Sequence, residues 1–515
     1  MFLGLDSSTQ SLSAVILNPA SAQILASESV NFGKDLPHYN SPSGFIPGGR
    51  DGEVHADPRM WLEALDLLFK KLSETVDLSG IKIIAGSGQQ HGSVYCGDGF
   101  DSALSTLDPR KTLVEQLSSK FTRDTSPIWM DTSTGEECAE ITAALGGSSE
   151  VCALSGSVAI ERFTGPQIRR FYKHEAGAYA ATTRIHLISS FIASVFAGKS
   201  IPIDYGDGAG MNLLNLADLA WDNDLLKATA PNLAEKLLPA ASCLEPQGTV
   251  SPYFTQKYGI PSNCQVCPFT GDNPASLVGM GATTPGQVVI SLGTSDTFFA
   301  AMPDAKTDPQ GFGHVFGNPA GGFMSLICFR NGSLAREALR DELGVDWSAF
   351  EKAALALSEA SAGKNITLPF YGAEITPRHD FGSPVSQFSE EANPSLRIRS
   401  LLEGQFLNMK LHSAWMGVTT DSIRLTGGAS KNDGIAQLVA DVFQAPVERL
   451  DVANSAALGA ALIAAAAGGN DLKTLQETFC KPAPDSLLQP NPALAGKYST
   501  ALEQFAKLLA ATTGA

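Results

Sequence analysis

The first apolar segments of the chain are short and lie on either side of a polar turn. Residues 2–6 and 12–17 are rich in aliphatic side chains, and Ser7–Gln10 between them carries hydroxyl and amide groups. Short apolar runs bounded by turn residues are typical of β-strands. The sequence therefore predicts a β-hairpin with a polar tip.

A helical pattern follows over residues 57–72. Asp57 is a favourable N-cap and Pro58 suits the first helical position, where its missing N–H would have no partner. The apolar side chains that fall on one helical face are Trp61, Leu65, Leu68 and Leu72. A predicted strand at 81–84 comes next, so strands and helices alternate as in an α/β protein.

The second half of the chain repeats the opening design. An apolar segment at 288–292 leads into the turn Gly293–Asp296 and then into the apolar residues 298–300. Self-similarity at this distance predicts two related lobes. The length of 515 residues agrees, because it exceeds that of most single domains. We expect an N-terminal lobe of residues 1–278, a C-terminal lobe of residues 279–515, and a cleft between them.

Two further segments of the second half predict phosphate or nucleotide binding. Residues 422–426 read as a strand that ends at Gly427 and Gly428, and an amphipathic helix follows. A strand, a glycine turn and a helix form a common geometry for binding phosphate at a helix N-terminus. An alanine-rich helix is predicted at 454–467, and we expect it to pack closely beside the nucleotide.

Charge and cysteine content limit the partners of the protein. A formal net charge of −17 argues against nucleic acid, which is bound mainly through clustered Lys and Arg. The first six residues lack a basic segment and reach Asp6, and no apolar run has the length of a bilayer span. The eight cysteines are scattered, as in a cytoplasmic protein with reduced thiols, and Cys264 and Cys267 are expected to be packing residues.

The polar turns supply the candidate phosphate chemistry. Asp6 offers a carboxylate for a hydrated Mg²⁺, and Thr9 offers a hydroxyl to phosphate oxygens. Gly293 and Thr294 form a second turn of the same kind, so two lobes would present hairpins to opposite sides of one triphosphate. Polar hairpin tips are common structural features, and two related turns are more informative than one.

Two segments of the first half supply candidate sugar chemistry. Asp272 and Asn273 precede a predicted helix, where Asp272 would either face the cleft or cap the helix. Gln90 and His91 lie between glycines in a loop after the strand at 81–84, and Arg162 adds a charged donor. Side chains of these kinds suit the recognition of hydroxyl groups.

Taken in order, six motifs resemble those of the FGGY family of carbohydrate kinases. They are residues 3–10, 86–92, 161–165, 270–276, 291–296 and 426–430. The resemblance covers nearly the whole chain. Within the family it is closer to the members that phosphorylate D-xylulose, particularly those of animals.

The resemblance implies an α/β fold of two ribonuclease-H-like lobes, as in the actin-like ATPases, with a cleft that closes on both substrates. Sugar would bind mainly to residues 1–278 and ATP mainly to residues 279–515. The reaction would transfer a phosphoryl group from ATP to the primary 5-hydroxyl of D-xylulose, giving D-xylulose 5-phosphate and ADP.

The resemblance also implies roles for single residues. Asp272 would be the general base, with Asn273 beside it. The other sugar contacts would be Gln90, His91 and Arg162. Adenine and ribose would be bordered by Gly428, Ala429 and Asn432, with Gly427 in the same turn and Trp347 near the base. The phosphates would meet Asp6 with Mg²⁺, Thr9, Gly293 and Thr294.

The sequence departs from the bacterial pattern of these kinases at two places. Gln90 replaces the usual Met before His91, and Asp131 follows Trp129 and Met130 where Asn usually follows Trp. These differences favour the animal-like subgroup and leave Asp131 without an assigned ligand.

Two alternatives remain open. A kinase of the same family for ribulose, glycerol, fuculose or gluconate would share most of these motifs. A nucleotide-gated regulatory protein of the same fold would share the lobes but would not need Asp272 as a base. The expected partners are a small-molecule sugar and MgATP, with no nucleic acid and no membrane, and a homodimer is compatible with the sequence.

Overall fold

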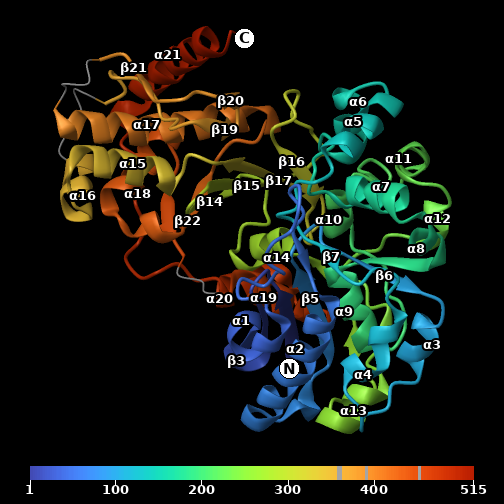
Figure 1. The fold of residues 1–515 in the computed structure, drawn as a ribbon. Helices are drawn as coiled ribbons and strands as arrows, with labels where there is room; N and C mark the ends of the chain where they lie inside the picture. Colours follow the sequence, from blue (N-terminus) through green and yellow to red (C-terminus); the bar gives the residue numbers. More distant parts are fainter. Residues whose placement is uncertain (356–361, 389–392, 451–453, 515) are drawn as a thin grey trace. The chain divides into compact units, whose positions relative to one another are not determined.

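The chain forms two compact units. A computed structural model describes residues 1–355, 362–388, 393–450 and 454–514. Unit 1 comprises Met1–Gly281, Val315–Phe323 and Ala453–Cys480, and unit 2 comprises Ala282–His314, Met324–Val452 and Lys481–Ala515. Figure 1 labels many of the elements, which are described below for each unit separately.

The sheet of unit 1 begins with the predicted hairpin. Strand β1 pairs antiparallel with β2, and on its other side it pairs parallel with β5, so that Asp6 lies opposite Ser87. The strand predicted at 81–84 begins only at Ile83, because Ile81 N–H closes a preceding 3-10 turn on Leu78. The strand order is β11 (Gly248–Thr249), β12 (Gln265–Val266), β5 (Ile83–Gly88), β1 (Phe2–Ser7), β2 (Ser11–Asn18) and β3 (Gln23–Asn31), and β13 (Thr270–Gly271) also pairs with β5.

Helices cover this sheet and complete the apolar core. The predicted helix is α2 (Pro58–Thr75), whose N-cap Asp57 accepts a hydrogen bond from Arg59 N–H at 2.9 Å. Trp61, Leu65 and Leu68 of α2 are fully buried in the core of the unit. The other helices of unit 1 include α7 (Thr164–His174), α9 (Ile188–Ala197), α13 (Pro252–Tyr258), α14 (Asp272–Gly279), α19 (Ser455–Ala467) and α20 (Leu472–Phe479).

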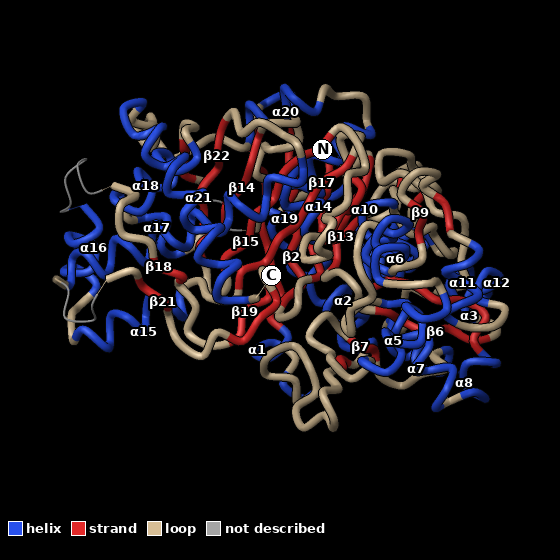
Figure 2. Tube along the Cα trace, turned by 90° about the horizontal axis from the view of Figure 1, so that it is seen from above, coloured by secondary structure: helices blue, strands red, loops and turns tan. Residues whose placement is uncertain are grey.

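The second sheet confirms the predicted repeat. β14 pairs antiparallel with β15 and parallel with β22, as β1 does with β2 and β5. The strand order is β16 (His314–Gly317), β17 (Phe323–Phe329), β15 (Asp296–Met302), β14 (Gln287–Leu292), β22 (Ser422–Thr426) and β23 (Val447–Arg449). Figure 2 shows the neighbouring strands β15, β14 and β22 as a red group. The main helices of unit 2 are α15 (Ser333–Leu343), α16 (Trp347–Leu355), α17 (Pro394–Ser413), α18 (Asp433–Phe443) and α21 (Ala495–Thr513).

The alanine-rich helix α19 forms as predicted and belongs to unit 1, and its expected place beside the nucleotide stays a prediction. It packs on α14 and β1, where a Cβ on Gly459 would be 1.8 Å from Ala275 O and a Cβ on Gly4 would be 2.1 Å from Ala461 N. Such short backbone approaches exclude any side chain at these positions. The small residues in α19 therefore allow close packing in the interior of unit 1.

The placement of α19 changes the expected domain division. Unit 1 ends its first segment at Gly281, close to the expected boundary at 278, but it also includes Val315–Phe323 and Ala453–Cys480. Both segments belong to the range 279–515 that was expected to form the other lobe. The physical reason for the second segment is the close packing of α19 against α14 and β1.

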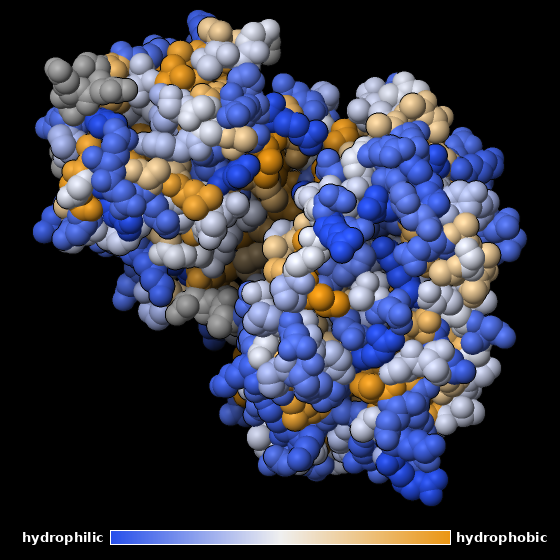
Figure 3. All heavy atoms as spheres, in the orientation of Figure 1, coloured by the Kyte–Doolittle hydropathy of each residue, from blue (hydrophilic) through white to orange (hydrophobic). Residues whose placement is uncertain are grey.

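The outer faces of both units are mostly hydrophilic in the view of Figure 3, and the apolar atoms visible there form separate patches. No helix in the described part of the chain has the length and apolar character needed to cross a bilayer.

Candidate active site

Three strand ends place the sugar-side candidates of unit 1 together. β1 and β5 are parallel, and β13 is also parallel to β5 with Gly271 opposite Gly88. Parallel strands end at the same edge of a sheet, where α/β proteins commonly bind ligands. Asp6, the loop that holds Gln90 and His91, and Asp272 at the start of α14 therefore all lie at one edge.

Asp6 is a buried carboxyl that is affected electrostatically by Asp272. Asp6 is 9% exposed, and Ser87 Oγ donates a hydrogen bond to its Oδ1 at 2.8 Å. Burial and the negative charge of Asp272 raise the pKa of Asp6 to about 7. Loss of solvent likewise raises the pKa of Asp272 to about 6, against the opposing effect of nearby hydrogen bonds. Two such carboxyls favour a bound cation or a proton between them.

Asn273 links the candidate base to the loop after β5. Its Nδ2 donates to Gln90 Oε1 at 2.7 Å and to Asp272 Oδ1 at 3.1 Å. Asp272 is the first residue of α14 and Gly271 is the N-cap. Asp272 therefore does not cap the helix, which was the alternative role considered for it from the sequence. A Cβ on Gly271 would be 2.6 Å from Gln90 Cγ, which explains the glycine. The carboxylate, the amide and Gln90 thus form one connected group.

His91 is held from several sides. Its ring stacks on Phe163, with centroids 4.2 Å apart and an interplanar angle of 21°, and its Nδ1 lies 2.7 Å from Gly210 O. Burial, helped by the positive charge of Arg162, lowers the pKa of His91 to about 3. The backbone of His91 has a φ of +71°, and Thr164 Oγ1 donates to its carbonyl at 2.9 Å. The structure therefore brings His91 and Arg162 together, as expected, around a neutral imidazole.

A glycine-rich segment outside the six sequence motifs supports this group. Residues 204–210 form α10 (Tyr205–Gly208) and the start of the 3-10 helix η5 (Ala209–Met211). Gln90 Nε2 lies 3.5 Å from Gly206 O, at the limit of a hydrogen bond. Asp207 is fully buried, accepts from Ser189 Oγ at 2.5 Å, and its Oδ1 has no partner within the described residues. Burial raises the pKa of Asp207 well above its usual range.

Thr9 and Asp131 both have protein partners. Trp129 Nε1 donates to Thr9 Oγ1 at 2.8 Å, so the tip of the first hairpin is tied to the Trp129 segment. Asp131 is fully buried and accepts from Val54 N–H at 2.9 Å and Gln167 Nε2 at 2.7 Å, with His55 Nε2 at 3.3 Å. Burial opposes ionisation of Asp131, but hydrogen bonds from His55, Ser133 and Val54 outweigh it and lower the pKa of Asp131 below its usual range. Asp131 therefore connects the segment of Val54 and His55 to Gln167 of α7.

The phosphate-side candidates of unit 2 share a sheet edge. β14 and β22 are parallel, with Ser291 opposite Thr426, so the turns at Gly293 and Gly427 follow neighbouring strand ends. Gly427 has a φ of +91°, and a Cβ there would be 2.3 Å from Leu292 O. Glycine is required at 427, and Thr294 lies in the adjacent β14–β15 turn.

A buried ion pair supports the first of these turns. The sequence motifs did not predict it. Arg336 and Asp296 are each 1% exposed, and Arg336 donates to both carboxylate oxygens of Asp296 at 2.9 Å. Arg336 also donates to Gln405 Oε1 at 3.0 Å and lies 3.4 Å from Gly293 O. Asp296 was visible in the motif, but only the fold brings Arg336 from α15 beside it.

Four of the expected nucleotide residues line one cavity of unit 2. The cavity has a volume of about 410 Å³, and its lining includes Trp347, Gly428, Ala429 and Asn432. Trp347 is 42% exposed and its ring lies 4.6 Å from the Arg340 guanidinium carbon. Asn432 caps α18 through Oδ1, and its Nδ2 has no hydrogen-bond partner in the described residues. An aromatic ring, an open glycine turn and an unpaired amide suit a nucleoside.

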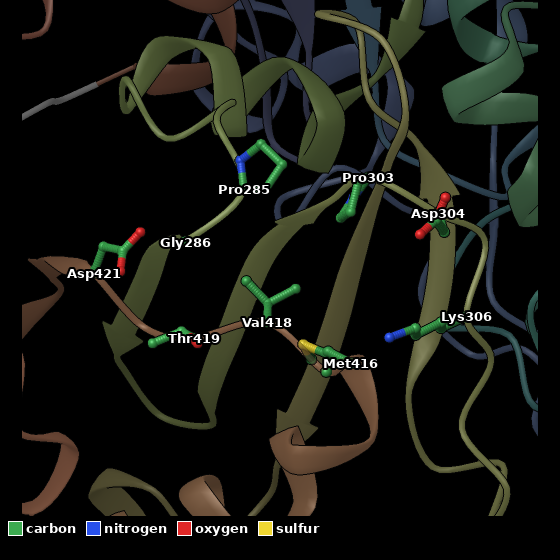
Figure 4. A pocket seen from close by; sticks show the side chains of 10 residues that line it. Pro285, Gly286, Pro303, Asp304, Lys306, Met416, Val418, Thr419 and Asp421 are labelled. Carbon is green, nitrogen blue, oxygen red and sulfur yellow. The ribbon is translucent and has the colours of Figure 1, made fainter.

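Figure 4 shows a smaller cavity of unit 2, with a volume of about 240 Å³. Its lining includes Gly286, immediately before β14, and Asp421, immediately before β22. These positions are at the amino ends of strands whose carboxyl ends carry Gly293 and Gly427. The cavity in Figure 4 is therefore separate from the nucleotide candidates.

Cys264 and Cys267 are buried free thiols, and Cys264 belongs to the core of unit 1. Burial raises the pKa of each thiol to about 12. Both side chains are buried, as expected for packing residues.

Comparison with known proteins identifies the family. The model of the N-terminal domain of the FGGY family of carbohydrate kinases matches residues 124–279, and that of the C-terminal domain matches residues 288–468. The chain is 41% identical to "Xylulose kinase" of Rattus norvegicus over 523 aligned positions, covering 98% of this chain and 96% of the relative.

Solved structures confirm the fold. A xylulose kinase from Rhodospirillum rubrum is similar with a TM-score of 0.81 at 21% identity, covering 100% of this chain and 99% of the other. A gluconate kinase from Lactobacillus acidophilus has a TM-score of 0.81 at 20% identity, covering 99% and 97%. The expected α/β fold with actin-like ATPase lobes is thereby confirmed. Together with the converging residues in each unit, these matches show that the chain belongs to the FGGY family of carbohydrate kinases.

Proposed function

We propose that this carbohydrate kinase transfers a phosphoryl group from ATP to the primary 5-hydroxyl of D-xylulose, giving D-xylulose 5-phosphate and ADP. The observation that carries the choice of sugar is the 41% identity, over nearly the whole chain, to a relative named xylulose kinase. The hydrogen-bonded group of Asp272, Asn273 and Gln90 in unit 1, with His91 next to Gln90 in the same loop, supports a polar, hydroxyl-rich ligand.

Asp272 acts in this proposal as the general base. It orients the primary hydroxyl and accepts its proton late, because phosphoryl transfer passes through a loose transition state. A pKa raised to about 6 leaves Asp272 ionised at neutral pH and makes it a stronger base than an ordinary aspartate. Asn273 fixes the carboxylate through its 3.1 Å hydrogen bond to Oδ1.

The carboxylate pair fits a hydrated Mg²⁺. Asp6 offers a hard oxygen ligand, its pKa is raised by burial and by Asp272, and a divalent cation would relieve this repulsion. Mg²⁺ commonly keeps several waters and uses one or two carboxylates plus phosphate oxygens, so Asp6 alone suffices as a first ligand. The bound ion would neutralise charge on the phosphates, while Thr9 offers a hydroxyl to the same group.

The nucleotide is assigned to unit 2. Trp347 would stack on the base, and Gly428, Ala429 and Asn432 would border the adenine and ribose in the cavity that they line. The turns at Gly293, Thr294 and Gly427 would direct backbone N–H groups toward the phosphates, since they follow parallel strands at one sheet edge.

We infer a cytoplasmic protein that acts on small molecules. The free cysteines within the described residues and the net charge of −17 support this inference, since the charge disfavours nucleic acid as a partner. A homodimer stays a prediction, which a measurement of molecular mass in solution would test.

The fold does not choose the sugar, because a gluconate kinase superposes with the same TM-score as a xylulose kinase. ADP release from MgATP should therefore be measured with D-xylulose, L-xylulose, D-ribulose, L-ribulose, glycerol, gluconate and no sugar. Strong stimulation by D-xylulose alone is the expected result. Stimulation by another polyol would move the specificity and keep the chemistry, and no stimulation by any sugar would favour a regulatory nucleotide-binding protein.

A further inference from the structure

The sugar-side histidine has one ring nitrogen whose hydrogen-bonding role is fixed by its partner. His91 Nδ1 lies 2.7 Å from the carbonyl oxygen of Gly210. A carbonyl oxygen can only accept a hydrogen bond, so Nδ1 must carry a proton. Nε2 has no hydrogen-bond partner among the described residues, and the side chain is buried except for 7% of its surface.

The charge of the ring is fixed as well. Burial and the Arg162 guanidinium lower the pKa of His91 to about 3, so the imidazole is neutral at physiological pH. A neutral imidazole that is protonated on Nδ1 has a lone pair on Nε2. The free nitrogen is therefore an acceptor, while the neighbouring Arg162 can only donate.

The absence of a side chain at Gly210 leaves room for the His91 ring in its observed position. A Cβ at residue 210 would be 2.9 Å from both Cε1 and Nδ1 of His91, and Phe163 stacks on the ring with the centroids 4.2 Å apart. The backbone of His91 is left-handed, with a φ of +71°, a conformation that few non-glycine residues adopt, and this conformation sets the direction of the side chain. Ring position, tautomer and backbone are thus set by separate contacts.

We propose that the carbonyl of Gly210 holds His91 in the neutral form protonated on Nδ1, so that Nε2 meets the sugar as an acceptor and selects a ligand hydroxyl that donates to it. Gly210 is then a positioning residue for sugar specificity, acting through His91. This inference rests on the proposed sugar-kinase function for its ligand, but the tautomer itself does not depend on that function.

The tautomer can be measured without activity. Long-range ¹H–¹⁵N correlation spectra of the full chain distinguish a protonated ring nitrogen from an unprotonated one, and the spectrum of His91→Gln identifies the signals of His91. We expect protonated Nδ1 and unprotonated Nε2 throughout pH 5–8, which spans about the range where an ordinary histidine titrates. A protonated Nε2 in the sugar-free protein would overturn the proposal.

Kinetics of Gly210→Ala test the positioning. The new Cβ should displace the ring and break the bond to residue 210, raising the KM of the sugar that stimulates ADP release by about tenfold, the loss expected for one hydrogen bond. kcat and the KM for MgATP should stay close to those of the parent chain, as for lost uniform binding. An unchanged sugar KM would overturn the proposal.

Gly208→Ala is the matched control, because a Cβ there meets the side chains of Trp221 at 3.3 Å and Ile203 at 3.4 Å and does not meet His91. It should leave the sugar KM near that of the parent chain, and a rise equal to that of Gly210→Ala would assign the effect to the segment as a whole. If Gly210→Ala does not fold, the spectra of the unmodified chain still decide the tautomer. If no sugar is phosphorylated, the proposed function fails while the tautomer is still measured.

Discussion

Asp272 is the residue on which the proposed chemistry depends most. We predict that Asp272→Asn lowers turnover by about a hundred- to ten-thousand-fold, the contribution typical of a general base. Sugar binding should survive, because the amide keeps the shape and the contact with Asn273. Turnover is read from ADP release at saturating MgATP, and sugar affinity is read by calorimetry.

A matched control separates catalysis from general damage. Asp224→Asn removes a carboxylate of the same unit that is 77% exposed, and it should leave turnover unchanged. The melting temperature of Asp272→Asn should not fall, because desolvation already disfavours the charged carboxylate. Near-normal turnover of Asp272→Asn would remove Asp272 as the base.

The raised pKa of Asp272 predicts a pH dependence of the sugar kcat/KM. The ionised carboxylate of Asp272, which acts as the base, predominates only above its pKa, and desolvation raises this pKa to about 6. At saturating MgATP, where a cation at Asp6 would hold that carboxylate ionised, the sugar kcat/KM should therefore reach a plateau above about pH 7 and fall tenfold per pH unit well below about pH 6. Residual turnover of Asp272→Asn should lose this acidic limb. MgATP affinity measured at each pH controls for titration of the nucleotide, and an equal limb in Asp272→Asn would contradict the assignment.

Much of the candidate site could be predicted residue by residue, and the rest depended on contacts across the chain. Asp6, His91 and Asp272 stand in recognisable local motifs. Arg336 could not be found in this way, because it reaches Asp296 only after α15 has packed beside the β14–β15 turn. Gly210 belonged to a visible glycine-rich segment, but its purpose depends on the position of the His91 ring.

At the scale of elements, the contact between α19 and α14 is controlled by glycine. We predict that Gly459→Ala destabilises the protein by about 1–3 kcal/mol, because its Cβ would lie 1.8 Å from Ala275 O and force the helices apart. This loss should exceed the gain of about 1 kcal/mol that alanine brings to a helix interior. Denaturant unfolding measures the change in the free energy of unfolding.

The control for this substitution is Gly496→Ala in α21, where a Cβ would have open space. It should leave stability unchanged or raise it slightly. A Gly459→Ala protein as stable as the parent would show that α19 packs less closely than described.

The ion pair that joins α15 to the β14–β15 turn gives a second prediction at this scale. Arg336→Gln should cost about 3–5 kcal/mol, since it leaves the buried Asp296 carboxylate without its cation. The double variant Arg336→Gln with Asp296→Asn should recover part of the loss, because no buried charge then remains. Thermal unfolding measures stability, and equal losses in both variants would contradict the account.

Elements were more predictable than their partners. The hairpin of β1 and β2, helix α2 and the segment from β22 to α18 all follow from local apolar patterns and caps. The packing of α19 in unit 1 does not, since alanines along a helix are compatible with any close neighbour. Only the glycines at 4, 279 and 459, which lie far apart in the sequence, determine the partner together.

At the scale of the whole molecule, the chain builds two units from interleaved segments. The repeated strand order made two lobes predictable, and the first boundary lay close to Gly281. The return of the chain to unit 1 through residues Ala453–Cys480 could not be read from hydrophobic periodicity, which describes one element at a time. Both units therefore depend on the folding of the whole chain.

The proposed reaction predicts a change of the whole molecule on binding. The sugar hydroxyl and the γ-phosphate must come within bonding distance, and water is the competing nucleophile, so we expect closure when both substrates are bound. X-ray scattering should show a smaller radius of gyration with D-xylulose and a non-hydrolysable ATP analogue together than with either alone. Asp272→Asn should compact equally, because it still binds both ligands, and glycerol in place of D-xylulose serves as the mismatched sugar. No compaction with both ligands, at concentrations that calorimetry shows to be saturating, would mean that the enzyme excludes water without a large movement of its units.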